Sequence, residues 1–144
     1  MTENNRFDLL DFLPYMLNQA AEASSGAFQA YYKDRYGMLR TEWRVLFHLG
    51  RHGDMTAKDI CHSAKTHKTK VSRAVRALEE KRYVRRSPLE SDRRNEVLSL
   101  THEGRQVFKD LAKAAEVYDA KLTEPFSAEE QTVLRSCLAR IAGL

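Results

Sequence analysis

The sequence predicts a mainly α-helical fold that carries one small β-hairpin. Three observations support this prediction: apolar residues recur every three or four positions along most of the chain, alternation is confined to residues 84–87 and 95–100, and capping residues precede several helical stretches. The chain has 144 residues, of which 42% are hydrophobic and 31% charged. That size and composition indicate one globular domain with a substantial core.

The first expected helix covers residues 8–36, where leucine, alanine and aromatic residues recur at helical spacing. Asp8 or Asp11 can cap it, and Gly37 is a natural end. Pro14 is tolerated because it lies near the first turn. A helix of this length is long for a small domain and has apolar residues on more than one face, so we expect it to pack against a second subunit.

Two shorter helices should follow. Thr41 is a good N-cap for a second helix that ends at Gly50 or Gly53. Thr56 is followed three residues later by Asp59, which is a capping-box-like start to a short third helix.

A fourth, basic helix is expected from His67 to about Lys81, with Thr66 as its cap. Its apolar positions define a stripe to be buried, made of Val71, Ala74, Val75 and Leu78. The opposite face carries Thr69, Arg73, Arg76 and Glu80, flanked by Lys70 and Ser72. A short helix, a tight turn and a longer basic helix make a helix-turn-helix, whose second helix can present donors to base edges and phosphates.

A β-hairpin should come next, because helical periodicity stops at Tyr83. Residues 84–87 form the first expected strand, and residues 95–100 form the second, with Leu98 and Leu100 on one face. A hairpin after a helix-turn-helix is a wing. Its arginines are Arg85 and Arg86 at one flank and Arg93 and Arg94 near the tip, where they suit a narrow minor groove.

Two amphipathic helices complete the chain. Thr101 begins the fifth, which stops before Pro125, and Ser127 with Glu130 forms a capping box for the sixth. Little folded mass remains to cover their apolar faces. We therefore expect these helices to contact each other and a partner.

The positive charge is concentrated in the helix-turn-helix and wing. Residues 65–105 hold 12 Lys or Arg against 6 Asp or Glu, a charge of +6, whereas the rest of the chain holds 12 against 14, a charge of −2. Such a patch predicts contact with the phosphates of double-stranded DNA. The alternative is an ordinary solvated charged face.

Other classes of protein find little support. The sequence has no Gly-rich phosphate loop, no GxSxG and no HExxH, so we expect neither an enzyme nor a cofactor. Cys61 and Cys137 fit no metal or redox spacing and are expected to be buried structural thiols. With no apolar run long enough to span a bilayer and no signal sequence in evidence, we expect a cytoplasmic location.

The order of these elements resembles the MarR family of dimeric winged-helix transcription regulators. Three segments carry the resemblance: LRTEWRVLFHL, HKTKVSRAVRALE and SDRRNEVLSLTHEGR. The family's wing pattern falls on Asp92, Arg94, Leu100, Thr101, Gly104 and Arg105. The resemblance implies one MarR-type domain over residues 1–144, with a DNA-binding lobe at 38–101 and dimerisation helices at 8–36 and 102–144.

The resemblance also implies which residues meet DNA. The major-groove set on the fourth helix is His67, Lys68, Thr69, Lys70, Ser72, Arg73 and Arg76. The wing adds Arg86, Asp92, Arg93 and Arg94, with Arg94 in the minor groove and Asp92 orienting the wing arginines. A homodimer would then bind a pseudo-palindromic operator with half-sites about 10 bp apart.

Members of this family commonly respond to a small phenolic or aromatic carboxylate, so the resemblance favours a repressor released by such a ligand. The expected ligand-binding residues are Phe12, Tyr15, Met16, Trp43 and Phe47. Aromatic residues at helical spacing are also what an ordinary core contains.

Three alternatives stay open. The winged helix could be a protein-interaction module without a DNA partner. Cys61, near His62 and Lys65, could make the protein oxidant-responsive. His48 and His52 could share a metal, although surface or capping histidines explain the pair as well, and no metal is expected.

Overall fold

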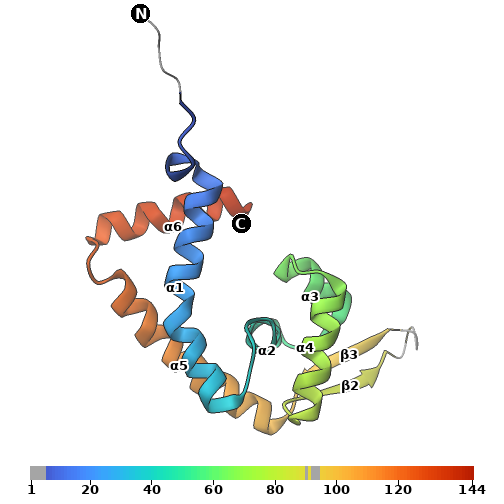
Figure 1. The fold of residues 1–144 in the computed structure, drawn as a ribbon. Helices are drawn as coiled ribbons and strands as arrows, with labels where there is room; N and C mark the ends of the chain where they lie inside the picture. The colour runs from blue at the N-terminus through green and yellow to red at the C-terminus, as the bar shows by residue number, and fades with distance from the viewer. Residues whose placement is uncertain (1–5, 90, 92–94) are drawn as a thin grey trace, which may run out of the picture.

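The computed structural model describes residues 6–89, 91 and 95–144 (Figure 1). Its elements run in the order η1 (a 3-10 helix, Leu9–Asp11), α1 (Leu13–Tyr36), α2 (Arg40–His52), β1 (Met55–Thr56), α3 (Ala57–Ala64), α4 (Lys68–Glu80), β2 (Val84–Pro88), β3 (Glu96–Leu100), α5 (His102–Thr123) and α6 (Ala128–Ala142). The prediction of a mainly helical fold with a small β-wing is confirmed.

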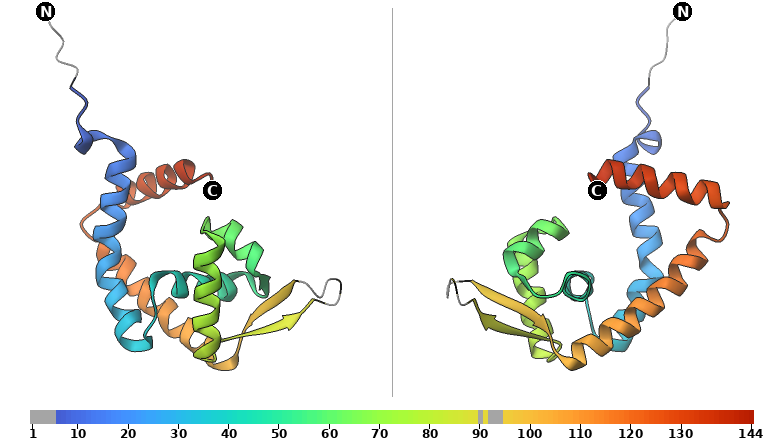
Figure 2. Two further views of the ribbon diagram at one scale, coloured as in Figure 1. Left: turned by 45° about the vertical axis from the view of Figure 1, so that its right-hand side comes forward. Right: turned by 180° about the vertical axis from the view of Figure 1, so that it is seen from behind.

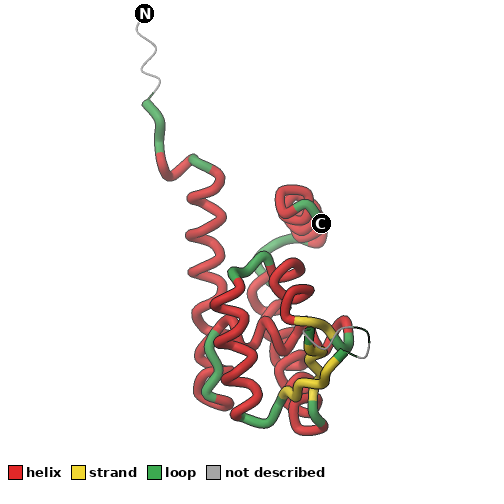
Figure 3. Tube along the Cα trace, turned by 90° about the vertical axis from the view of Figure 1, so that its right-hand side faces the viewer, coloured by secondary structure: helices red, strands yellow, loops and turns green. Residues whose placement is uncertain are grey.

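The elements form two groups. Helices α3 and α4 and the sheet lie together on one side, and α2 lies between them and the paired helices α1 and α5 (Figures 1 and 2). Helix α6 folds back from the far end of α5 (Figure 2). Viewed from the side of the wing, the strands lie against the helices of the helix-turn-helix, and α6 lies above them (Figure 3).

Three helix starts are as the sequence predicts. The Thr56 hydroxyl accepts from the Asp59 amide at 3.1 Å, and the Asp59 carboxylate accepts from the Thr56 amide at 3.2 Å. Thr101 accepts from the amide of Gly104 at 3.0 Å at the start of α5. Ser127 and Glu130 form the same reciprocal box at the start of α6. These local hydrogen bonds satisfy amides that have no partner within the helix.

Three other helix starts differ from the prediction. Helix α1 begins at Leu13 rather than at residue 8, because a helix continuous from there would place the Pro14 ring against the carbonyl of Leu10. Asp8 instead caps η1 by accepting from the Leu10 amide at 3.0 Å. Phe12 precedes α1 in an extended conformation and provides no side-chain cap.

Helices α2 and α4 also start at other residues than predicted, because other side chains provide their caps. At α2 the N-cap is Leu39, not Thr41, and the Glu42 carboxylate accepts from the Leu39 amide at 2.7 Å. At α4 the N-cap is His67, not Thr66, and its Nδ1 accepts from the Thr69 amide at 3.2 Å.

The sheet has three antiparallel strands in the order β1-β3-β2. In β3, Leu98 lies opposite Met55 of β1 on one side and Arg86 of β2 on the other. Strand β1 was not predicted, because two residues are too few to show a period. The helix-turn-helix and the wing therefore share one sheet, with β3 at its centre.

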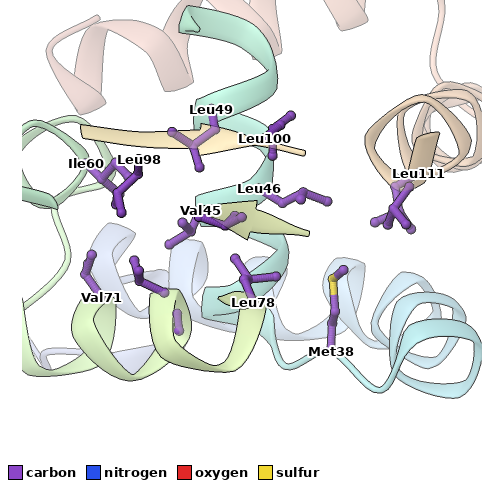
Figure 4. Close-up of a cluster of buried hydrophobic side chains, with 14 of the residues drawn as sticks. Met38, Val45, Leu46, Leu49, Ile60, Val71, Leu78, Leu98, Leu100 and Leu111 are labelled. Atoms are coloured by element: carbon purple, nitrogen blue, oxygen red, sulfur yellow. The ribbon is translucent and has the colours of Figure 1, made fainter. Parts of the chain in front are cut away.

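The core fills the lobe. The predicted stripe of α4 is buried, with Leu78 fully inaccessible and Val71, Ala74 and Val75 between 1% and 3% exposed. Around it lie Leu46 and Leu49 of α2, Ile60 of α3 and Leu98 of β3, as Figure 4 shows. Met38 and Leu111, both at 0% exposure, continue the same core to the base of α5.

Most of the large apolar side chains that are exposed outside this core lie in two places. One set lies at the start of the described chain: Phe7, Leu9, Leu10, Phe12, Leu13 and Met16. The other lies on α5, α6 and their connection: Val117, Leu122, Phe126, Val133, Leu134, Leu138 and Ile141. No residue of α6 is buried. Among the described residues, no helix combines the length and apolar character required to cross a membrane.

Candidate nucleic-acid interface

Helix α4 presents a polar face directly opposite its buried stripe. The predicted DNA-binding residues His67, Lys68, Thr69, Lys70, Ser72, Arg73 and Arg76 are all exposed. Within the described parts of the chain, Lys68, Lys70 and Arg73 form no ion pair, while Arg76 lies 3.6 Å from Glu80 on the helix surface. The face therefore offers three uncompensated cations beside two hydroxyls, a composition suited to phosphates and base edges.

The back of α4 is fixed by a partly buried ion pair. The Lys81 ammonium, at the end of α4, lies 3.2 Å from the carboxylate of Glu42 in α2. Only 5% of the Glu42 side chain is exposed, and its second oxygen accepts from the Leu39 amide. The front turn is set by Lys65, whose left-handed backbone (φ 50°) ends α3 and reverses the chain toward α4. Helix α4 is thus held at both ends.

The two arginines of β2 differ in environment. Arg85 is exposed and makes no ion pair with another described residue. Arg86, a predicted DNA contact, instead donates to Glu79 of α4 at 2.5 Å and to Glu96 of β3 at 3.3 Å. The hydrogen bond to Glu79 raises the pKa of Arg86. The other wing residues expected to meet DNA, Asp92, Arg93 and Arg94, lie outside the described residues.

The structure divides the residues expected to bind a small ligand. Trp43 and Phe47 stack edge to face with ring centroids 4.6 Å apart, and Trp43 also contacts Phe28 of α1. Phe12, Tyr15 and Met16 lie at the opposite end of α1, where Phe12 contacts Phe7. Phe12 precedes Phe28 by 16 residues, which is about 24 Å along a helix. Within one chain, therefore, only Trp43 and Phe47 of the five come together.

Sequence reasoning missed the residues that complete this junction. Phe28 of α1 and Tyr118 of α5 line two adjoining hollows with Trp43, of about 130 and 500 Å³. The smaller hollow is also lined by Arg40, which lies 3.0 Å from Glu22, and by exposed Arg44. The signal was present in the sequence, since Phe28, Tyr31 and Tyr32 recur at helical spacing.

A second missed cluster joins α1 to α5. The Asp110 carboxylate accepts hydrogen bonds from the hydroxyls of Tyr31 and Tyr36, and Arg35 lies 3.7 Å away. Burial and the Asp110 hydrogen bond raise the pKa of Tyr36 to about 12. Tyr36 therefore remains protonated at neutral pH and donates to Asp110, and the cluster ties the end of α1 to the middle of α5.

The cysteines and histidines show no assembled metal site. Cys61 is half-buried and Cys137 is exposed, which corrects the expectation that both are buried. His48 and His52 stack with centroids 5.9 Å apart, but no group of three metal-binding side chains occurs among the described residues. Burial lowers the pKa of His48, whose Nδ1 has no hydrogen-bond partner within the described chain.

The fold and this surface define a winged helix-turn-helix protein with appended helices. Residues 36–95 match the model of the MarR family. The HTH-type transcriptional regulator PecS of Dickeya dadantii (strain 3937) is 27% identical over 110 residues, which are 74% of this chain and 66% of PecS, slightly less than two thirds of its length.

Solved structures agree over a longer span. The transcriptional regulator PA4135 is 25% identical, with a TM-score of 0.81 over 92% of this chain and 97% of that chain. A MarR/EmrR family transcriptional regulator from Acinetobacter sp. ADP1 is 24% identical, with a TM-score of 0.84 over 95% and 96% of the two chains. The chain is therefore similar, in its winged helix-turn-helix and in its overall fold, to transcriptional regulators of the MarR family.

Proposed function

We propose that the protein is a homodimer that binds double-stranded DNA sequence-specifically and regulates transcription as a repressor. The observation that carries this proposal is the outer face of α4, where Lys68, Lys70 and Arg73 are exposed without ion pairs to described residues while the inner face is buried. A protein of the same fold, a MarR family transcriptional regulator from Listeria monocytogenes, was solved complexed with 26mer DNA.

A homodimer would cover the exposed apolar faces. Helix α6 buries none of its residues, although Val133, Leu134, Leu138 and Ile141 are each between 40% and 60% exposed. Leaving that much apolar surface in water is costly, and a second copy supplies a matching face through a two-fold axis. We expect a dimer by light scattering, and a shift toward monomer for Leu134→Glu combined with Leu138→Glu.

DNA binding is tested by comparing two variants, one that removes a positive charge inside the proposed interface and one that removes a positive charge outside it. Arg73→Ala should weaken operator binding in gel-shift titrations by roughly 5- to 150-fold, because a base or phosphate contact is worth about 1–3 kcal/mol. Lys113→Ala on exposed α5 removes the same charge far from the interface and should leave the affinity within about twofold. Equal effects of the two variants would contradict the assignment of α4.

Arg94→Ala tests the wing. The residue lies outside the described structure, so its role rests on the charge pattern and on the family's wing motif. We expect a severe loss of operator affinity while light scattering still reports a dimer. An unchanged affinity would remove Arg94 from the interface.

We propose further that a small aromatic carboxylate binds where Phe28, Trp43 and Tyr118 line the hollows. The aromatic walls match a ring, and Arg44 supplies a charge that no described acidic side chain pairs. In a protein of this fold, Bordetella bronchiseptica BpsR, DNA binding is regulated by 6-hydroxynicotinic acid. Release from DNA requires that the ligand bind the non-DNA conformation more tightly.

Trp43 is the single tryptophan of the chain, so its fluorescence reports on this junction directly. Titration with 4-hydroxybenzoate should quench or shift the emission and lower operator affinity, and Arg44→Ala should weaken both effects. 4-Hydroxybenzyl alcohol, which keeps the phenol but lacks the carboxylate, is the matched control. Identical responses to the two compounds would remove the carboxylate from the proposal.

The competing possibility is a protein-interaction module that does not bind DNA. Binding to a random duplex separates the two. Affinity that falls steeply with salt supports phosphate contacts, whereas no binding at low salt supports the interaction module. A reporter gene under the selected operator then distinguishes repression from activation.

A further inference from the structure

Arg86 belongs to the wing, but its side chain joins the wing to the recognition helix. Its Nε donates to Glu79 Oε1 near the end of α4 at 2.5 Å, and its Nη1 donates to Glu96 Oε2 of β3 at 3.3 Å. The guanidinium therefore bridges three elements: α4, β2 and β3. Charge-assisted hydrogen bonds of this kind are stronger than neutral ones and hold a defined geometry.

The strand geometry explains why Arg86, and not Arg85, makes this bridge. Successive side chains of a strand point to opposite faces. Val84 is buried against the core, so Arg86, two residues later, lies on the same face of β2 as Val84. Both arginines are exposed, but Arg85 lies on the other face and makes no ion pair with a described residue. The two adjacent arginines, which look equivalent in the sequence, thus have different surroundings.

The bridge borders a hollow between the wing and the helices. The hollow has a volume of about 540 Å³, and Lys68, Ser72, Arg86 and Glu96 are among the residues that line it. In the register of the sheet, Val84 lies opposite Leu100 and Arg86 lies opposite Leu98, and Val84, Leu98 and Leu100 are buried. Apolar packing therefore holds β3 along this stretch and β2 at Val84, and at Arg86 the ion pairs hold β2.

The charges argue against a phosphate contact at Arg86. With Glu79 and Glu96 the guanidinium forms a group whose net charge is −1, because two carboxylates surround one cation. Moving Arg86 to a phosphate would leave both carboxylates unpaired beside a polyanion, where like charges repel. Lys68, Lys70 and Arg73 form no ion pair with a described residue, so a phosphate contact by any of them would leave no such carboxylate unpaired.

We propose that Arg86 is a positioning residue that sets the angle between the wing and α4 and does not itself contact DNA. The inference rests on the proposed DNA-binding function and refines it. Helix α4 and the wing would read the major and minor grooves at the same time, so their separation must match the distance between those grooves. A residue that fixes the separation influences affinity without touching the DNA.

Two matched variants distinguish positioning from contact. Glu79→Gln and Glu80→Gln each remove one negative charge from α4, but Glu79 holds Arg86 whereas Glu80 lies 3.6 Å from Arg76 on the surface. Charge removal alone should strengthen DNA binding in both. We expect Glu80→Gln to bind as tightly as the wild type or more tightly, and Glu79→Gln to lose about fivefold, close to 1 kcal/mol.

Arg86→Ala is the second test. If Arg86 positions the wing, Arg86→Ala should lose about as much operator affinity as Glu79→Gln, and the double variant should lose no more than either single variant. The dependence of log affinity on log salt should keep its slope. A slope reduced by about 0.9, the value for one lost phosphate contact, would overturn the proposal.

Hydrogen exchange in the absence of DNA keeps this test separate from the proposed function. Amides of β2 and β3 should exchange faster in Glu79→Gln and Arg86→Ala than in the wild type, and at the wild-type rate in Glu80→Gln. Unchanged exchange in all three variants would overturn the proposal even if the wild type binds DNA. Accelerated exchange in a protein that binds no duplex would retain the bridge and refute only the DNA-binding function.

Discussion

Replacing Lys81 with methionine tests how firmly the ion pair with Glu42 holds helix α4 against α2. Methionine keeps the length of the side chain but removes the ammonium that lies 3.2 Å from Glu42. The Glu42 side chain is only 5% exposed, so its carboxylate would remain buried with the Leu39 amide as its remaining hydrogen-bond donor. Breaking a buried ion pair from one side costs about 3–5 kcal/mol.

The cost here should be at the lower end or below it. Because 29% of the Lys81 side chain is exposed, water already screens the pair. We therefore expect Lys81→Met to lower the free energy of unfolding by about 2 kcal/mol. For a domain of this size the melting temperature should fall by about 6 °C.

Urea denaturation followed by circular dichroism measures the effect, at one protein concentration because dimer stability depends on concentration. Lys113→Met on the exposed surface of α5 is the control, with an expected change within about 0.5 kcal/mol. Adding Glu42→Gln to Lys81→Met removes the buried charge but keeps an acceptor for the Leu39 amide, so about half of the loss should return. A Lys81→Met midpoint equal to that of the wild type would refute this reasoning.

Three further predictions concern stability. Gly104→Ala should lower the free energy of unfolding by more than about 1 kcal/mol, because a Cβ at this position would lie 2.0 Å from the Tyr83 carbonyl oxygen. A Cβ at Gly26 would meet nothing within 4 Å, so Gly26→Ala should raise the free energy of unfolding by about 0.5–1 kcal/mol, and thermal melts of the two variants test both expectations. His48→Gln should reduce acid destabilisation: the lowered pKa of His48 contributes stability that is present above about pH 6.5 and lost as pH falls through the folded value, so urea midpoints at pH 7.5 and 5.0 should differ less in the variant. Tyr36→Phe should flatten the alkaline limb, because a pKa raised from 10 to about 12 contributes stability that is complete below pH 10 and lost towards pH 12; an unaltered limb in chemical denaturation would contradict the shift.

Local rules were sufficient for much of the fold. The pairs Thr56 with Asp59 and Ser127 with Glu130 marked helix starts correctly because a capping box is complete within four residues. The buried stripe of α4 was also predictable, since helical spacing alone decides which side chains share a face.

The predicted caps of α2 and α4 were wrong because another side chain nearby provides the cap. Thr41 resembles a cap, but Glu42 reaches back to the Leu39 amide and moves the start of α2 by two residues. Thr66 resembles a cap as well, but its hydroxyl donates to the Ala64 carbonyl, and His67 provides the acceptor instead.

The parts of the candidate site that depend on non-local contacts could not be predicted from the sequence. The exposed cations of α4 follow from spacing, whereas the pairing of Arg86 with Glu79 depends on how β2 folds against α4. In the sequence Arg85 and Arg86 are equivalent neighbours. The junction of Phe28, Trp43 and Tyr118 likewise brings together three helices that are distant along the chain, and no single segment reveals it.

The start of α5 has a mechanical consequence. One residue, Thr101, separates the end of β3 from α5; its amide donates to the Tyr83 carbonyl, and the same carbonyl leaves no room for a side chain at Gly104. The strand and the helix are therefore joined tightly, and a tilt of α5 would be passed directly to the helix-turn-helix and the wing. The 22 residues of α5 span about 33 Å. If α5 tilted by about 5° about its C-terminal end, where the subunits would meet, its N-terminal end and the attached helix-turn-helix would move by about 3 Å. This distance is close to the rise of one base pair.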